Sequence, residues 1–135
     1  MIKYNQLRIP GRVTTPFGAR TKDEQSHQGM DIANVTGTPI PALRPGVVTG
    51  VGQATNGLGN VVKLRDNEGN VHQYSHLQKA LVRPGMRVQE GQEIAKMGSS
   101  GNSYSPSGND PSHLDIRIVN AFWRYKNPLL YLKNR

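Results

Sequence analysis

The sequence predicts a mainly β fold: a small antiparallel β-sandwich or barrel-like domain with little helix. Glycine and proline are frequent, at 15 and 9 of 135 residues, and this composition favours many turns and short strands over long helices. Runs rich in β-branched residues, such as the segment 46–52, recur between these turns. The stretch Asp66-Asn67-Glu68-Gly69-Asn70 supplies hairpin-turn residues between two such runs.

The first part of the chain is expected to be extended wherever it does not turn. Residues 14–18 predict a short extended piece and a turn. The segment from His27 to Ala33 is expected to be extended or tightly looped, because Gly29 would cost about 1 kcal/mol relative to alanine inside a helix. Two prolines limit the segment 37–42 to a turn that leads into an edge strand or strand start.

The rest of the chain predicts paired strands, two glycine turns and one closing turn of helix. Strands are expected at 46–52, 59–65, 71–77 and 112–119, with short apolar strands after the glycine turns within 82–88 and 89–95. The segment 98–110 is rich in Gly, Ser and Asn and predicts a long loop, and 128–132 predicts the helical turn. No linker divides the chain, so a single domain is expected over residues 1–135.

The stretch Ser112–Ile118 alternates polar and apolar residues in the manner of a strand. His113, Asp115 and Arg117 would share one face, and Leu114 and Ile116 would point to the other. An imidazole and a carboxylate on one rigid face make a metal or acid–base site possible. The alternative is a half-buried strand with a solvated polar face, and this segment by itself favours that alternative.

Other polar residues at separate points of the chain allow either a functional or a purely structural interpretation. His27 and Asp31 offer a nitrogen and an oxygen ligand suited to Zn²⁺, or a loop histidine and an aspartate that caps a turn. His76 is either an exposed histidine at a strand end or an imidazole placed for proton transfer. We interpret His72 as a surface residue of the hairpin without a role. Spacing alone does not show that these residues meet.

Composition excludes several classes of site and segment. The chain has no cysteine, so thiol nucleophiles, cysteine-type zinc sites and disulfides are excluded, and a metal must be held by His, Asp, Glu or backbone oxygen. No apolar run is long enough to span a bilayer, so membrane insertion is not expected. The first ten residues lack the apolar region of a secretory signal.

The net charge of +8 at pH 7 favours polyanionic partners, such as nucleic acid or the anionic bacterial wall. The basic residues are scattered, with no Lys/Arg block and no helix-turn-helix, zinc-finger or RNP pattern. Nucleic-acid binding would also leave the separated His and Asp motifs without a purpose. Nucleic acid is therefore not expected as a partner.

Taken in order, a series of short motifs resembles the lysostaphin/LytM-type zinc metallopeptidases, which cut peptidoglycan cross-links. The resemblance runs from about residue 10 to residue 132 and rests on many motifs in one order. These motifs are Phe17-Gly18-Ala19-Arg20, Ser26-His27-Gln28-Gly29-Met30-Asp31, Gly37-Thr38-Pro39, Gly46-Val47-Val48, Gly57-Leu58-Gly59-Asn60-Val61-Val62, Tyr74-Ser75-His76-Leu77, Val88-Gln89-Glu90-Gly91-Gln92-Glu93-Ile94 and Ser112-His113-Leu114-Asp115.

The resemblance implies the fold, the cofactor and the site. The fold would be the family's small β-sandwich, the duplicated hybrid motif, with a groove over one sheet. One Zn²⁺ per chain would be held by His27, Asp31 and Asp115, and His76 and His113 would be the catalytic histidines. One histidine would act as general base and the other would stabilise the oxyanion or protonate the leaving amine, with their order left open.

One position departs from the family's pattern, because Asp115 stands where the family's last motif ends in His. Aspartate is an accepted zinc ligand, but its charge lowers the net positive charge at the metal and makes the ligand set harder. Two explanations compete: a variant site in an active enzyme, or a degenerate site in a domain that only binds wall or a partner. The other four site residues remain, which favours activity.

The expected function is therefore a zinc-dependent endopeptidase that hydrolyses peptide cross-links of bacterial peptidoglycan. The alternative is a catalytically inactive wall-binding or regulatory module of the same fold. The protein is expected to act at the cell wall. Without a signal peptide, it would be a phage virion, tail or lysis protein, or a domain of a larger exported protein. The bond cleaved, the host and the oligomeric state are not readable from the sequence.

Overall fold

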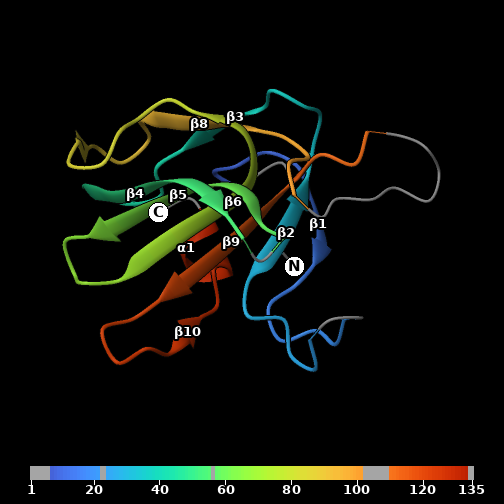
Figure 1. The fold of residues 1–135 in the computed structure, drawn as a ribbon. Coiled ribbons are helices and arrows are strands. Elements are labelled where there is room, and N and C mark those ends of the chain that lie inside the picture. The colour runs from blue at the N-terminus through green and yellow to red at the C-terminus, as the bar shows by residue number, and fades with distance from the viewer. Residues whose placement is uncertain (1–6, 22–23, 56, 102–109, 134–135) are drawn as a thin grey trace.

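A computed structural model describes residues 7–21, 24–55, 57–101 and 110–133. These segments form short strands and one helical turn (Figure 1). The elements in chain order are β1 (Arg12–Thr15), β2 (Met30–Ala33), β3 (Pro39–Pro41), β4 (Gly46–Ala54), β5 (Gly59–Asp66), β6 (Val71–Ala80), β7 (Arg87–Val88), β8 (Glu93–Met97), β9 (His113–Val119), β10 (Tyr125–Lys126) and α1 (Leu129–Leu132).

All strand pairs among the described residues are antiparallel, and the predicted mainly β fold with little helix is confirmed. The main path of the sheet runs β1-β2-β9-β6-β5-β4-β7, and β10 adds to β9. Strand β8 pairs with both β3 and β6 away from this path, and Figure 1 shows β3 and β8 together as a separate layer beside the main sheet.

Strand β6 joins the two layers because it changes partner along its length. Its first part, Val71 to Ser75, pairs with β9, and its second part, from Leu77 to Ala80, pairs with β8. His76 lies at the change and has a φ of 63°, in the left-handed region that non-glycine residues rarely adopt. The chain therefore changes direction at His76, which is one of the predicted catalytic residues.

The hydrophobic core lies on the face of the sheet that β3, β8 and the C-terminal turn cover. Leu114, Ile116 and Ile118 of β9 are fully buried in it together with Tyr74 of β6. The alternation read from the sequence of β9 is confirmed, since these three apolar residues share the core face. The side chains between them are left for the opposite face, where His113, Asp115 and Arg117 lie.

Most expected strands are found, with shifted ends. The hairpin at 66–70 is confirmed: the amide of Asp66 donates to the carbonyl of Asn70, and Gly69 has a φ of 88°. Strand β4 extends beyond the predicted 46–52 to Ala54, and β10 was not predicted. Most of the predicted loop at 98–110 lies outside the described residues. Over the described part of the chain, no helix has the length and apolar character needed to cross a membrane.

The interpretation of His72 as a surface residue is wrong. The side chain is fully buried, and its Nε2 donates to Oδ2 of Asp66 at 2.8 Å, while Asp66 also accepts the amides of Glu68 and Asn70. Tyr131 packs edge-on against the His72 ring, with 5.4 Å between centroids. The sequence pattern failed here because α1, which carries Tyr131, covers this end of the sheet, and no local periodicity indicates that.

Candidate metal centre

Three residues predicted from separate motifs meet where β2 and β9 pair. Asp31 on β2 lies directly opposite Asp115 on β9, and directly opposed side chains in an antiparallel pair share one face. His27 enters from the loop before β2, where its carbonyl accepts from the amide of Gly18 and its amide donates to the carbonyl of Ala19. One ligand atom from each of His27, Asp31 and Asp115 lies within 4.8 Å of the other two.

The environment of these atoms fits a cation. His27 Nε2 and Asp31 Oδ1 are 3.3 Å apart, and neither buried atom has a hydrogen-bond partner within the described structure. A buried polar atom without a partner costs about 1–3 kcal/mol, so such atoms are rare without a compensating ligand. An imidazole nitrogen with two carboxylates is a donor set that Zn²⁺ accepts. These residues could therefore hold a divalent metal.

The orientation of the His27 ring is set by Glu24. Nδ1 of His27 lies 3.2 Å from Oε1 of Glu24, and since the carboxylate only accepts, Nδ1 donates and Nε2 keeps its lone pair toward Asp31. Burial lowers the pKa of His27, but the carboxylates of Asp31, Asp115 and Glu24 outweigh it, and the pKa is raised. In a metal-free protein a proton therefore competes for the nitrogen that a metal would take.

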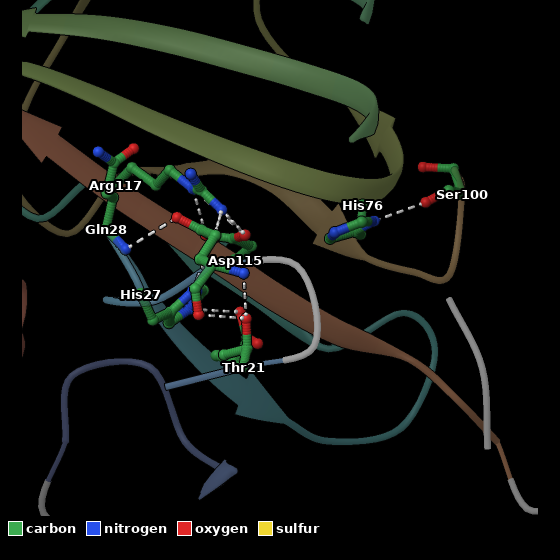
Figure 2. Close-up of polar contacts among 9 residues, drawn as sticks. Thr21, His27, Gln28, His76, Ser100, Asp115 and Arg117 are labelled. Carbon is green, nitrogen blue, oxygen red and sulfur yellow. Dashed lines mark hydrogen bonds and ion pairs between the residues drawn. The ribbon is translucent and has the colours of Figure 1, made fainter. Parts of the chain in front are cut away.

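The carboxylate of Asp115 is gripped by Arg117, two residues further along the same strand face (Figure 2). Nε of Arg117 donates to Oδ1 and Oδ2 of Asp115 at 3.1 and 3.3 Å, and Nη2 donates to Oδ2 at 3.0 Å. Nη2 also donates to Oε1 of Glu24 at 2.9 Å. A continuous chain of contacts thus joins Asp115 to His27 through Arg117 and Glu24.

His76 and His113 lie next to each other beside this cluster. Their ring centroids are 4.3 Å apart. Nδ1 of His76 donates to the carbonyl of Ser100 at 2.8 Å, and Nδ1 of His113 donates to the carbonyl of Pro111 at 3.1 Å. Because backbone carbonyls only accept, the neutral tautomer of each ring carries its proton on Nδ1 and its lone pair on Nε2.

The environment keeps His76 neutral near pH 7. Burial lowers its pKa, and the neighbouring His113 lowers it further, against the raising effect of the Ser100 carbonyl and the nearby carboxylates. A neutral imidazole with a free Nε2 is a general base. The positive φ of His76 stores backbone strain at this point, as is common where a structure fixes a functional side chain.

The same face of the sheet continues away from the histidines into a cavity of about 510 Å³. Its lining includes Trp123 and Tyr125 from the β9–β10 hairpin, together with Lys63, Gln73 and Arg117. Trp123 is 87% exposed although it is the largest side chain in the protein. The cavity and the His27–Asp31–Asp115 cluster thus lie on one sheet face, with Arg117 in contact with both.

The structure brings together all five predicted site residues, but sequence reasoning missed those that support them. Arg117 was in the alternating pattern on the face of Asp115, so a signal existed and was not used. Glu24 and the Ser100 carbonyl carried no signal, since their contacts depend on loop paths. Ser75, directly opposite Asp115, was also missed, and its buried Oγ has no partner among the described atoms.

Comparison with known proteins gives a family match and several relatives. The model of peptidase family M23 matches residues 25–128. "Murein hydrolase activator NlpD" of Escherichia coli is 36% identical over 125 residues, which make up 93% of this chain but only 30% of that relative. This chain therefore spans about a third of the curated relative's length.

Solved structures share the fold. The catalytic domain of the antimicrobial peptidase lysostaphin from Staphylococcus simulans is 30% identical with a TM-score of 0.73, over 92% of this chain and 91% of that chain. A zinc-containing peptidase from Vibrio cholerae is 25% identical with a TM-score of 0.73, over 93% of this chain and 37% of that chain.

Proposed function

Because the chain belongs to peptidase family M23, we propose that it is a zinc metalloendopeptidase that hydrolyses peptide cross-links of bacterial peptidoglycan. The resemblance to the lysostaphin/LytM-type enzymes is confirmed at the level of the family. The observation that carries the proposal is the convergence of His27, Asp31 and Asp115, whose ligand atoms lie within 4.8 Å of one another beside two paired histidines.

In this proposal His27 Nε2, one oxygen of Asp31 and one oxygen of Asp115 hold one Zn²⁺ per chain. The two unpartnered buried atoms, Nε2 of His27 and Oδ1 of Asp31, support the assignment because a cation would satisfy both. Zinc, when bound, acidifies a water molecule and polarises a carbonyl group, which is the chemistry that amide hydrolysis requires.

His76 and His113 are the proposed catalytic histidines. Each offers a free Nε2 because its Nδ1 is committed to a backbone carbonyl. His76, with its lowered pKa, is suited to accept a proton near pH 7. His113 is then available to stabilise the developing oxyanion or to protonate the leaving amine, although the reverse division of roles has the same geometry.

The sheet face beside the metal centre supports a peptide of the wall as the substrate. The cavity walled by Trp123 and Tyr125 offers apolar rings, and Lys63 and Gln73 offer polar groups on its floor. Acidic stem-peptide groups would be attracted to a chain with a net charge of +8. Docking on an anionic wall follows from the same charge.

The proposal is tested with the purified chain and purified peptidoglycan. We expect about one zinc per chain by elemental analysis, with release of soluble peptide fragments that a chelator stops and added zinc restores. His113→Ala is the matched control, because it should keep the metal while it loses the release. Fragment masses identify the bond cleaved. Absence of both metal and release would overturn the proposal.

A second candidate is an activator of murein hydrolases that itself cuts nothing. The name of the Escherichia coli relative and the aspartate at position 115 favour it. An activator would raise the release of wall fragments by a separate hydrolase, and its effect would survive His113→Ala. The metallopeptidase would lose its effect with that variant, so the same pair of proteins separates the candidates.

We further propose that residues 1–135 form one metallopeptidase domain that acts at the cell wall. The continuous sheet from β1 to β10 supports a single domain, since its strands come from nearly every described segment. The route to the wall would be a phage particle or lysis protein, or export as part of a larger protein. Limited proteolysis tests the domain, and fractionation of the source cells or virions tests the location.

A further inference from the structure

We propose that Arg117 is a positioning residue that fits Asp115 to its role as a metal ligand. This inference rests on the metal site proposed above. It concerns two properties of Asp115: the direction in which its carboxylate is held, and the charge that it brings to the centre. Both depend on contacts of Arg117 that no motif predicted.

The guanidinium of Arg117 binds the carboxylate of Asp115 through two of its nitrogens. Three N–H···O contacts of 3.0 to 3.3 Å reach both carboxylate oxygens, so rotation of the carboxylate is restricted. The Asp115 side chain is only 5% exposed, and a buried carboxylate without a partner would be costly. Arg117 therefore gives the buried carboxylate a partner and fixes the direction of its remaining lone pairs.

Arg117 also joins Asp115 to the first ligand of the centre. Its Nη2 donates to Glu24, and Glu24 accepts the Nδ1 proton of His27. The amide of Glu24 donates to Oγ1 of Thr21 at 2.9 Å, which fixes the start of this contact chain. Two of the three proposed ligands are thus oriented by one connected set of outer contacts, an arrangement that tunes metal sites.

The charge of the pair matters as much as its direction. His27, Asp31 and Asp115 together bring a charge of −2, and Arg117 offsets one of these charges at contact distance. Asp115 with Arg117 is neutral as a pair, and the Glu24 carboxylate shares the same guanidinium charge. Part of the extra negative charge that aspartate brings to the centre is therefore offset, which favours aspartate where the resemblance expects histidine.

Gly29 provides the space for this pair. A Cβ at position 29 would lie 2.6 Å from Cγ of Arg117 and 2.6 Å from Oδ1 of Asp115. Real side chains do not approach so closely, so any other residue would push the guanidinium or the carboxylate aside. The glycine between His27 and Asp31 is thus explained by the pair on β9.

The test is a double-mutant cycle with zinc affinity as the readout. Zinc dissociation constants are measured by competition with a chromogenic chelator for the wild type, Asp115→His, Arg117→Gln and the double variant. Asp115→His alone would leave a guanidinium facing the metal without its carboxylate, and we expect zinc binding to weaken at least about tenfold. In the Arg117→Gln background the same change should have much less effect.

Control variants separate the effect of the Arg117 charge from that of its bidentate hydrogen bonds and from any effect on folding. Arg117→Lys keeps the charge but not the fork, and Arg65→Gln removes an exposed arginine of β5 away from the centre. A second cycle uses Asp115→Asn in place of Asp115→His, so that the coupling can still be measured if the histidine variant misfolds. Circular dichroism shows whether each variant is folded. We expect Arg65→Gln to leave zinc affinity and both cycles unchanged.

The outcomes are distinct. Coupling between positions 115 and 117 in either cycle supports the inference. If the wild type binds zinc and the change at 115 has the same effect with Arg117 and with Gln at 117, the inference is wrong and the proposed function stands. If the folded wild type binds no zinc, the proposed function fails and this inference fails with it.

Discussion

The rings of His76 and His113 lie in contact, with centroids 4.3 Å apart and an angle of 39° between their planes, although the two residues come from different strands. The partner change of β6 and the bridge between Gly98 and His113 produce this proximity. Each ring is anchored through Nδ1, so neither depends on the metal for its position. We therefore expect either histidine to be replaceable without loss of a proposed metal ligand.

We predict that His76→Ala and His113→Ala each lower kcat for cross-link hydrolysis by about 10²–10⁴-fold, the usual contribution of a positioned acid or base. Zinc content should stay near that of the wild type, because neither residue is a proposed ligand. Elemental analysis and fragment release are measured on the same samples. Loss of zinc from either variant would contradict this separation of roles.

Replacement of a proposed metal ligand should instead remove the zinc itself. We expect Asp31→Ala to lose zinc, because a single imidazole and one carboxylate remain. At zinc about 1,000-fold above the dissociation constant, binding should stabilise the wild type by about 4 kcal/mol and the variant by almost nothing. Urea unfolding with zinc and with a chelator measures the difference. Equal stabilisation of both proteins would exclude Asp31 as a ligand.

The buried pair of Asp66 and His72 predicts a dependence of stability on pH. Burial lowers the pKa of His72, so the folded protein keeps it neutral while the unfolded chain binds a proton below about pH 6.5. The pKa of Asp66 is also lowered: burial would raise it, but the hydrogen bonds from His72 and Asn70 together outweigh this. Both groups bind more protons when unfolded, so stability rises with pH and is lost as pH falls.

His72→Gln provides the comparison, because its amide can still donate to Asp66 but does not titrate. We expect the free energy of unfolding of the wild type to fall between pH 7 and pH 5 more steeply than that of the variant. Urea unfolding in the presence of chelator removes the contribution of metal binding from both. Parallel curves for the two proteins would show that His72 does not carry this dependence.

Because the Trp123 ring is exposed, we expect it to contribute to the binding of wall fragments and not to the stability of the fold. Trp123→Ala removes one wall of the cavity of about 510 Å³ but no core contact, since the side chain is 87% exposed. We expect KM for wall fragments to rise about tenfold, which corresponds to about 1.4 kcal/mol, with kcat and the melting temperature unchanged. Phe122→Ala is the matched control, because Phe122 is 82% exposed and does not line the cavity. A fall in kcat without a change in KM would argue against this role.

Gly29→Ala should damage both stability and metal binding. The new Cβ would lie 2.7 Å from the carbonyl oxygen of Ile116, which cannot move without breaking the sheet. We expect a loss of about 1–3 kcal/mol in the free energy of unfolding, in the range of overpacked sites, and weaker zinc binding. Gly52→Ala serves as the control, because a Cβ there meets nothing within 4 Å. Equal stability of the two variants would contradict the crowding argument.

The local sequence predicted the strands well where turn residues flanked a segment of alternating apolar and polar residues. The hairpin of β5 and β6 and the apolar face of β9 follow from glycine at a positive φ and from period-two burial. Pattern failed at β10, which holds only Tyr125 and Lys126 and is too short to show a period. It also failed at His72, whose burial depends on residues far along the chain.

Residue types alone limit the chemistry of this chain: it has four histidines, no cysteine, and an aspartate where the family has histidine. The order of its motifs was enough to recognise the family. Three relationships became visible in the folded chain: Asp31 lies opposite Asp115, His76 contacts His113, and Arg117 binds Asp115. The first two relationships join segments that lie far apart in the chain, so they depend on strand pairing and loop paths that long-range packing sets.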